Sequence, residues 1–306
     1  PGLYTARRNY FAEQLEAATL NTEVLGAVIR KEVRQAYYQL WYLEDKKRLF
    51  VRLDSLYTGL FQAAEIRLRS GDAALLDKLA AEVKLKESKA LLEQITGEMD
   101  IQQKQLMLLL NVEERLLPAD EPLHKREPGQ PGVMTHPLLS VQEQNVRIAS
   151  SNMAVQKQSN RPEFSGRFFT QRLWGAPDPF TGFSVSVSIP VFGKEAYKSR
   201  SNVARSEKKV QEETLEFRTR QLETEKAAAI TEIEKNRSLL HFYETSGLNQ
   251  ADMLIRTATL SYRSGEISFA ELSQYLSQAI GIRQNYLDVL NLYNQSVIQF
   301  NYLNNN

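Results

Sequence analysis

The sequence contains no cysteine, only three histidines and a formal charge of only +1. Without cysteine there can be no disulfide bond, thiolate metal site or cysteine nucleophile. His124, His136 and His241 lie far apart along the chain, so we do not expect a histidine-rich metal cage. With 38 basic and 37 acidic residues, the chain lacks the basic excess typical of nucleic-acid-binding proteins, and we expect no nucleic-acid partner.

The sequence also lacks long apolar runs and motifs that carry chemistry. Its longest apolar run is Leu106–Leu110, far below the roughly 20 residues of a membrane-spanning helix. We find no nucleophile paired with a base, no phosphate-binding loop and no metal-ligand spacing. We therefore expect neither an enzyme nor a bound cofactor or metal.

Proline is missing from two long stretches, Thr5–Ser70 and Gly193–Ser264. Both consist largely of Ala, Leu, Glu, Gln, Lys and Arg, which favour helix. At 1.5 Å per residue each helix would be roughly 100 Å long. Helices of that length must pack side by side as antiparallel coiled coils or line a tube.

Apolar residues in these stretches and in the segments that follow them recur every three, four or seven positions, which is typical of coiled-coil seams. One such stripe, in the last segment, is interrupted only by Arg283. The stripes comprise Leu92, Ile95, Met99, Leu106 and Leu109; Val203, Val210 and Phe217; Leu215, Leu222 and Ala229; and Leu272, Leu276, Ala279, Tyr286, Leu290, Tyr293, Val297 and Phe300.

The middle of the chain differs. Prolines between Pro118 and Pro137 break the helical pattern, and Arg161-Pro162 ends a shorter helix. Beyond it, apolar residues alternate with serines from Phe183 to Ile189, which predicts a strand with one apolar and one small polar face. The aromatic-rich run Glu163–Trp174 is the expected partner strand. A lone hairpin has open edges, so we expect strands from other copies to join it.

The predicted fold class is therefore mainly α, with very long antiparallel coiled-coil helices and one β-hairpin. We divide the chain into a first long helical hairpin (1–116), a proline-rich segment (117–137), a short helix (138–160), a β-hairpin (161–192) and a second long helical hairpin (193–306).

The two long helical hairpins resemble each other. Arg69-Ser70-Gly71-Asp72 and Arg263-Ser264-Gly265-Glu266 share an Arg-Ser-Gly-acid string at the end of a long helix. A carboxylate, Asp77 or Glu271, follows six residues after each glycine. The second copy lacks the short helix and the β-hairpin that complete the first, so we expect roughly 100 further residues before Pro1 in the natural protein.

The order of these motifs resembles that of the TolC-type outer membrane factors (outer membrane efflux protein family). The resemblance rests on five strings and covers nearly the whole chain. They are Thr135–Leu138, Gln158–Pro162, Phe183–Gly193, Tyr262–Gly265 and Leu292–Ser296. The run Val33–Tyr42 is similar to that of members serving heavy-metal resistance-nodulation-division (RND) pumps.

This resemblance implies an incomplete protomer of a β-barrel continued by an α-barrel. It implies a homotrimer in the outer membrane, with the helices in the periplasm, that works with a periplasmic adaptor (membrane fusion protein) and an inner-membrane RND pump. It would be a passive exit duct for cations or small molecules.

The resemblance also implies three sets of functional residues. The helix tips that dock the adaptor are Arg69, Ser70, Gly71, Asp72, Arg263, Ser264, Gly265 and Glu266. The channel gate comprises Asp77, Glu271 and Tyr262, and the strand face toward outer-membrane lipid comprises Phe183, Val185, Val187 and Ile189. Ile267 stands where the family has a gating arginine, which argues against a salt-bridge lock.

The alternative hypothesis is a soluble coiled-coil scaffold or a periplasmic adaptor-like protein with a small β insert. It would form no pores and stay in solution without detergent. A scaffold has no need for a strand face made of serines, which favours the duct.

Overall fold

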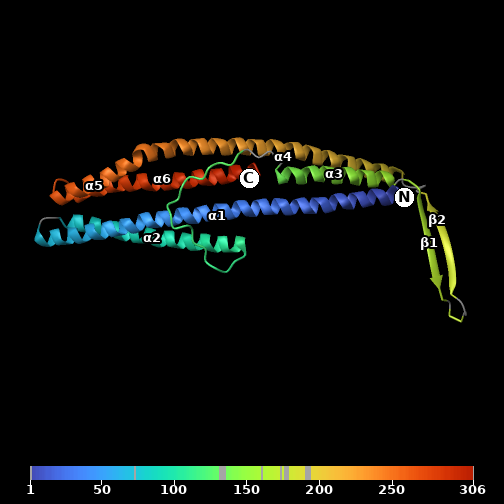
Figure 1. Cartoon of the computed structure of the whole chain (residues 1–306), viewed down its shortest axis with the longest axis horizontal. Helices are drawn as coiled ribbons and strands as arrows, with labels where there is room; N and C mark the ends of the chain where they lie inside the picture. Colours follow the sequence, from blue (N-terminus) through green and yellow to red (C-terminus); the bar gives the residue numbers. More distant parts are fainter. Residues whose placement is uncertain are drawn as a thin grey trace. The chain divides into compact units, whose positions relative to one another are not determined.

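The computed structural model describes residues 2–71, 74–130, 136–159, 161–172, 174–175, 179–189 and 194–305. It confirms a mainly α-helical fold with one β-hairpin (Figure 1). The elements are α1 (Gly2–Ser70), α2 (Leu75–Leu110), α3 (Pro137–Gln158), β1 (Glu163–Gln171), β2 (Phe180–Ser188), α4 (Lys194–Phe242), the π-helical turn η1 (Tyr243–Gly247), α5 (Leu248–Ser264) and α6 (Phe269–Leu303).

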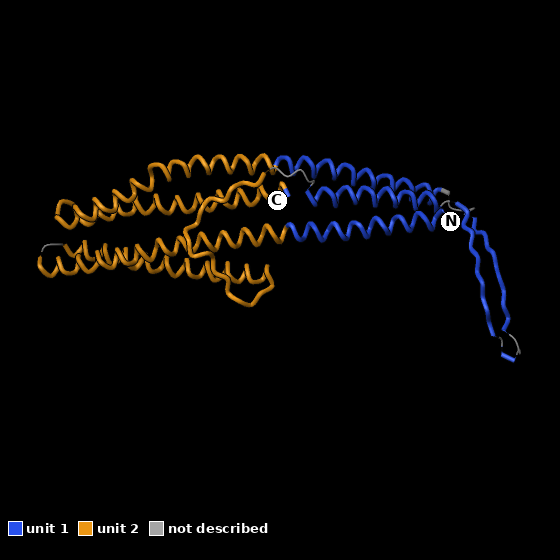
Figure 2. The backbone as a smooth tube through the Cα atoms, in the orientation of Figure 1, with its two compact units in different colours: residues 1–27, 133–224, 305 blue, residues 28–132, 225–304, 306 orange. Residues whose placement is uncertain are grey.

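Backbone contacts divide the chain into two compact units (Figure 2). Unit 1 comprises residues 1–27, 133–224 and 305, and unit 2 comprises residues 28–132, 225–304 and 306. The helices α1 and α4 contribute to both units. The division of the sequence into five segments stays a prediction.

The core of unit 2 is built on the predicted apolar stripe of α6. Leu272, Leu276, Ala279, Leu290 and Val297 are completely buried. Leucines of three other helices are buried as deeply: Leu40 and Leu43 of α1, Leu106 of α2 and Leu240 of α4. Burying each of these leucine or valine side chains contributes roughly 1.5–3 kcal/mol. The seam therefore stabilises the packing of the long helices.

The helix α2 ends earlier than its apolar composition suggests, at Leu110 instead of Leu116. Asn111 takes the left-handed conformation (φ 52°) and its N–H bonds back to the last helical turn, which stops the helix. The buried face of α2 includes two polar residues, Ser88 and Gln103. The Gln103 amide donates to the carbonyl oxygen of Leu116 at 3.4 Å.

The second long helix is not continuous, because the π-helical turn η1 separates α4 from α5. Gly247 closes this turn. A Cβ atom on Gly247 would lie 3.0 Å from the Tyr243 ring and 3.6 Å from Ile282 of α6. Glycine therefore lets the irregular turn pack closely against α6.

Residues 111–130, called the strap below, cross unit 2 without regular secondary structure. Side chains of the helices satisfy the polar groups of its main chain. Asn294 of α6 accepts from the N–H of Arg126 at 2.8 Å and donates to the carbonyl oxygen of His124 at 3.0 Å. Asn301, two helical turns further on, accepts from the N–H of Gly129 at 2.8 Å.

The helix α1 holds the other side of the strap. The Trp41 indole N–H donates to the carbonyl oxygen of Glu121 at 2.8 Å, and Asp45 accepts from the N–H of Leu123 at 2.7 Å. The His124 ring packs edge-on against Trp41, with ring centroids 4.9 Å apart. The aromatic run Val33–Tyr42 thus has a structural use as an anchor for the strap.

In unit 1, polar side chains contribute to the packing between helices. The buried Gln144 of α3 donates to the carbonyl oxygen of Glu13 of α1 at 2.8 Å, and Gln142 donates to Gln211 of α4. The helix α3 begins where its sequence dictates, with Pro137 in the first turn and the His136 ring accepting from the N–H of Leu138.

One predicted seam in unit 1 is not buried within the chain. Val203, Val210 and Phe217 of α4 are each more than half exposed. The helix α1 carries a similar exposed stripe made of Tyr4, Phe11 and Leu25, which are seven and fourteen residues apart. Unit 1 therefore carries two apolar stripes that its own described residues leave uncovered.

The hairpin pairs β1 with β2 in an antiparallel register from Glu163↔Ser188 to Gln171↔Phe180. All nine residues of β1 are exposed, as are nearly all of β2. Its outer edges have no partner strand among the described residues, since the sheet has two strands.

Candidate functional site

Two glycine turns end the helical hairpins of unit 2. Gly71 follows α1 and Gly265 follows α5, and both have φ of +81°. The Gly265 N–H bonds to the carbonyl oxygen of Tyr262, and the Glu266 N–H to that of Ser261, which closes the last turn of α5. No heavy atom lies within 4 Å of a Cβ built on either glycine, so the positive φ alone accounts for the choice of glycine.

The two turns lie at the same end of unit 2 (Figure 1). Contact between their helices confirms this, because the Arg67 guanidinium of α1 sits 5.1 Å from the centre of the Tyr262 ring of α5. The structure thus brings together most of the predicted docking residues, all of them exposed: Arg69, Ser70, Gly71, Arg263, Ser264, Gly265 and Glu266. The predicted docking residue Asp72 lies outside the described residues.

The predicted gate carboxylate Glu271 has a structural partner in Ser268. The Ser268 hydroxyl accepts from the N–H of Glu271, and the Glu271 carboxylate accepts from the N–H and hydroxyl of Ser268, both at 2.8 Å. This capping box starts α6. The hydrogen bonds from the backbone and side chain of Ser268 lower the pKa of Glu271 below its usual 4.5. Glu271 therefore carries its negative charge firmly at neutral pH.

Asp77 occupies the equivalent position at the start of α2, but its surroundings differ. The cap residue there is Ala74, which has no side chain to complete a capping box. Asp77 is only partly exposed. The repeat thus preserves the place of the carboxylate, while the second turn alone has the reciprocal hydrogen bonds.

Tyr262, the third predicted gate residue, is buried. Its ring packs against Phe269 of α6 with centroids 5.9 Å apart, beneath the Arg67 guanidinium. These contacts join α5, α6 and α1 close to the glycine turns. Its role in a gate stays a prediction.

The hairpin has two chemically different faces. The predicted apolar residues of β2 and the segment after it are exposed: Phe183, Val185, Val187 and Ile189. The register adds Phe164 and Phe168 of β1 to that face, opposite Val187 and Phe183. The poor alternation of β1 hid these two residues from sequence analysis, although pairing with β2 could have found them.

Serines cover the opposite face. Ser184, Ser186 and Ser188 share it with Ser165 and Arg167 of β1, and the hydroxyl groups of Ser165 and Ser186 are 2.7 Å apart. Phe169 breaks the pattern of β1 because it falls on the serine face. Its ring lies over Gly182, where there is no room for a side chain.

Within the described residues no three His, Asp or Glu side chains are grouped to hold a metal ion. The same residues include no helix long and apolar enough to cross a membrane.

Among the described residues, long paired helices, glycine turns at one end of unit 2 and one two-faced hairpin match part of the protomer fold of TolC-type outer membrane channels. A membrane protein from Pseudomonas aeruginosa has this fold, with a TM-score of 0.89 and 17% identity over 99% of this chain and 74% of its own. CusC has a TM-score of 0.87 and 15% identity, again over 99% and 74%. The CmeC outer membrane channel of Campylobacter jejuni has a TM-score of 0.88 and 11% identity, over 99% and 68%.

At these identities the likeness establishes the fold. No family profile and no curated protein matches the sequence itself.

Proposed function

We propose that this chain is the outer-membrane component of a tripartite efflux pump, a passive exit duct for cations or small molecules. The observation that carries the proposal is the hairpin. Its apolar and serine faces both stay exposed, and its edges are open among the described residues. A closed sheet formed with strands of other copies would place the apolar face against outer-membrane lipid and the serines toward a water-filled lumen.

Unit 1 supports assembly with other copies. The exposed stripe of Val203, Val210 and Phe217 on α4 has a spacing of seven, and that of Tyr4, Phe11 and Leu25 on α1 has spacings of seven and fourteen. Helix α4 of one copy could therefore pack against a helix of the next, and a head-to-tail contact of this kind closes into a ring. We propose a homotrimer, with the helices in the periplasm.

The glycine turns are the proposed contact with a periplasmic adaptor, which links the duct to an inner-membrane RND pump. They are exposed and lie at one end of unit 2, as an end-to-end contact requires. Asp77 and Glu271 follow these turns on α2 and α6. Repeated by threefold symmetry, their carboxylates would ring the aperture and favour cations, with Tyr262 behind them.

Planar-bilayer recordings of the full-length protein test the duct and its gate separately. We expect wild-type protein to form cation-selective pores, and we expect Glu271→Gln and Asp77→Asn to reduce that selectivity. Glutamine keeps the capping box, so Glu271→Gln removes charge without removing the start of α6. Glu195→Gln, a change in an exposed carboxylate of α4, is the matched control.

The two outcomes against the proposal are distinct. Pores with unchanged selectivity in both variants would remove the gate. A protein that stays in solution without detergent and forms no pores would be the soluble scaffold or adaptor-like alternative.

A further inference from the structure

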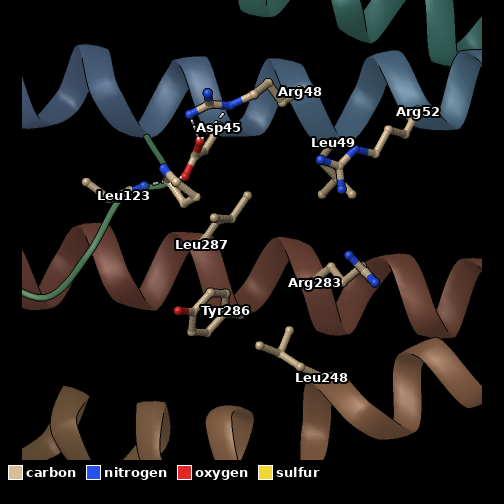
Figure 3. Close-up of a pocket in the computed structure, with 10 residues that line it drawn as sticks. Asp45, Arg48, Leu49, Arg52, Leu123, Leu248, Arg283, Tyr286 and Leu287 are labelled. Carbon is tan, nitrogen blue, oxygen red and sulfur yellow. Dashed lines mark hydrogen bonds and ion pairs between the residues drawn. The ribbon is translucent and has the colours of Figure 1, made fainter. Parts of the chain in front are cut away.

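A cavity of about 340 Å³ opens in unit 2 between α1, the strap, α5 and α6 (Figure 3). The residues that line it come from all four segments. Those used below are Leu49 and Arg52 of α1, Leu248 of α5, and Arg283, Tyr286 and Leu287 of α6. The function proposed above does not involve this cavity.

Two irregularities of unit 2 meet at this cavity. Arg283 is the polar interruption in the otherwise apolar stripe of α6, and it forms an ion pair with Asp252 of α5. The π-helical turn η1 ends at Gly247, immediately before the lining residue Leu248. Turns of this type are rare, and they occur frequently at functional sites.

The charges around the cavity do not balance. Arg48 is fully engaged, since it pairs with Asp45 and donates to the carbonyl oxygen of Glu121 at 3.0 Å. Arg52, one turn further along α1, has no hydrogen bond or ion pair with any residue that the structure describes. In Figure 3 its guanidinium extends toward that of Arg283 across the gap between α1 and α6.

At one end of the cavity the Arg283 guanidinium is thus paired with Asp252, whereas the exposed Arg52 guanidinium has no carboxylate partner among the described residues. An anion placed between the two guanidinium groups would relieve their repulsion and accept charge-assisted hydrogen bonds from both. Guanidinium groups match carboxylate and phosphate geometry especially well.

The rest of the cavity is apolar. Leu49, Leu248 and Leu287 line it together with the ring of Tyr286. Burial, with help from Glu244 and Asp45, raises the pKa of the Tyr286 hydroxyl, so this side chain stays neutral. Walls of this kind suit a hydrocarbon or aromatic body, and the volume is within the usual range for small-molecule sites.

We propose that this cavity binds a small organic anion, with its carboxylate or phosphate group between Arg52 and Arg283 and its apolar body against the leucines and Tyr286. Such a ligand bridges α1, α5 and α6 and therefore stabilises unit 2 in proportion to its occupancy. The proposal holds whether or not the protein forms a duct.

Binding is tested by isothermal titration of the full-length protein in detergent with phenyl phosphate, benzoate, inorganic phosphate and benzylamine. We expect phenyl phosphate and benzoate to bind. We expect at least tenfold weaker binding of inorganic phosphate, which lacks the apolar body, and no binding of benzylamine, which has the opposite charge. Phenyl phosphate should also raise the thermal unfolding midpoint in a concentration-dependent way.

Arg52→Gln is the principal variant, because Arg52 has no partner whose loss would harm the fold. It should weaken binding of phenyl phosphate at least tenfold. Arg283→Gln combined with Asp252→Asn should do the same without leaving a carboxylate unpaired. Arg30→Gln, a change in an exposed arginine on α1 away from the cavity, should leave binding unchanged.

The proposal is overturned if phenyl phosphate does not bind to wild-type protein or binds equally well to Arg52→Gln. Equal binding of inorganic phosphate would overturn the apolar part of the site. Equal binding of benzylamine would overturn the charge argument.

Discussion

The strap and the hairpin are both long non-helical segments, yet the helices bind the first and leave the second exposed. Helix side chains bind the strap's main chain from two sides, chiefly Asn294 and Asn301 on one side and Trp41 and Asp45 on the other. Among the described residues, β1 and β2 pair only with each other, and both faces of the hairpin are exposed. The strap is therefore held within one chain, whereas the proposed duct would give the hairpin its partner strands only in an assembly of several copies.

The largest effect expected from this contrast concerns the apolar face of the hairpin. Val185→Arg should prevent stable insertion into the outer membrane, because an arginine facing lipid costs about 2–4 kcal/mol in every copy. The measurement is the fraction of protein recovered with outer membranes. Ser186→Arg, one residue further on the serine face, should insert normally; equal loss in both variants would contradict the two-faced hairpin.

The next effect concerns the strap. Asn294→Ala removes two part-buried hydrogen bonds to the main chain, worth about 1 kcal/mol each, so it should destabilise the strap by about 2 kcal/mol. Hydrogen exchange at the amides of Arg126 and Gly129 should become correspondingly faster. Asn249→Ala, a change in an exposed asparagine at the start of α5, should leave both amides unchanged. Unchanged protection in Asn294→Ala would show that other contacts hold the strap.

The two tryptophans give a smaller and more direct comparison, since Trp41 anchors the strap and Trp174 is fully exposed beside the hairpin turn. Trp41→Phe keeps an aromatic ring but loses the hydrogen bond to Glu121, at a cost of about 1 kcal/mol. Trypsin cleavage after Lys125 and Arg126 should accelerate. Trp174→Phe should leave this cleavage rate as it is, and a similar acceleration in both would refute the anchoring role of the indole N–H.

The smallest effect is expected on the serine face. Ser165→Ala removes a hydroxyl contact between two exposed serines, so thermal stability should change by less than about 0.5 kcal/mol. Ser186→Ala should behave alike. A larger loss measured by calorimetry would mean that this face is not open to water.

Sequence patterns predicted the parts of the fold that depend on local preference and simple periodicity. Proline-free stretches gave the long helices, alternation gave β2, and positive φ explains the glycines at positions 71 and 265. The capping box at Ser268 and Glu271 was also readable, as a serine followed three residues later by glutamate.

What the sequence did not reveal depends on contacts between distant segments. The role of Asn294 and Asn301 emerges only when the strap lies against α6, although two asparagines seven apart inside an apolar stripe were a usable signal. The spacing of Val203, Val210 and Phe217 predicted a seam, but the structure leaves these side chains exposed. Periodicity cannot tell whether the partner helix belongs to the same chain. The register that places Phe169 over Gly182 likewise needs both strands.

The hydrogen bonds that Asn294 and Asn301 form with Arg126, Gly129 and His124 go to peptide groups of the strap and not to the side chains of these residues. Exposed residues of the strap, such as Glu127, could therefore be substituted without changing the path of the strap over the helices. A strap bound through its main chain can tolerate changes in its exposed side chains. It is therefore a suitable place to insert an epitope tag or attach a fluorescent label.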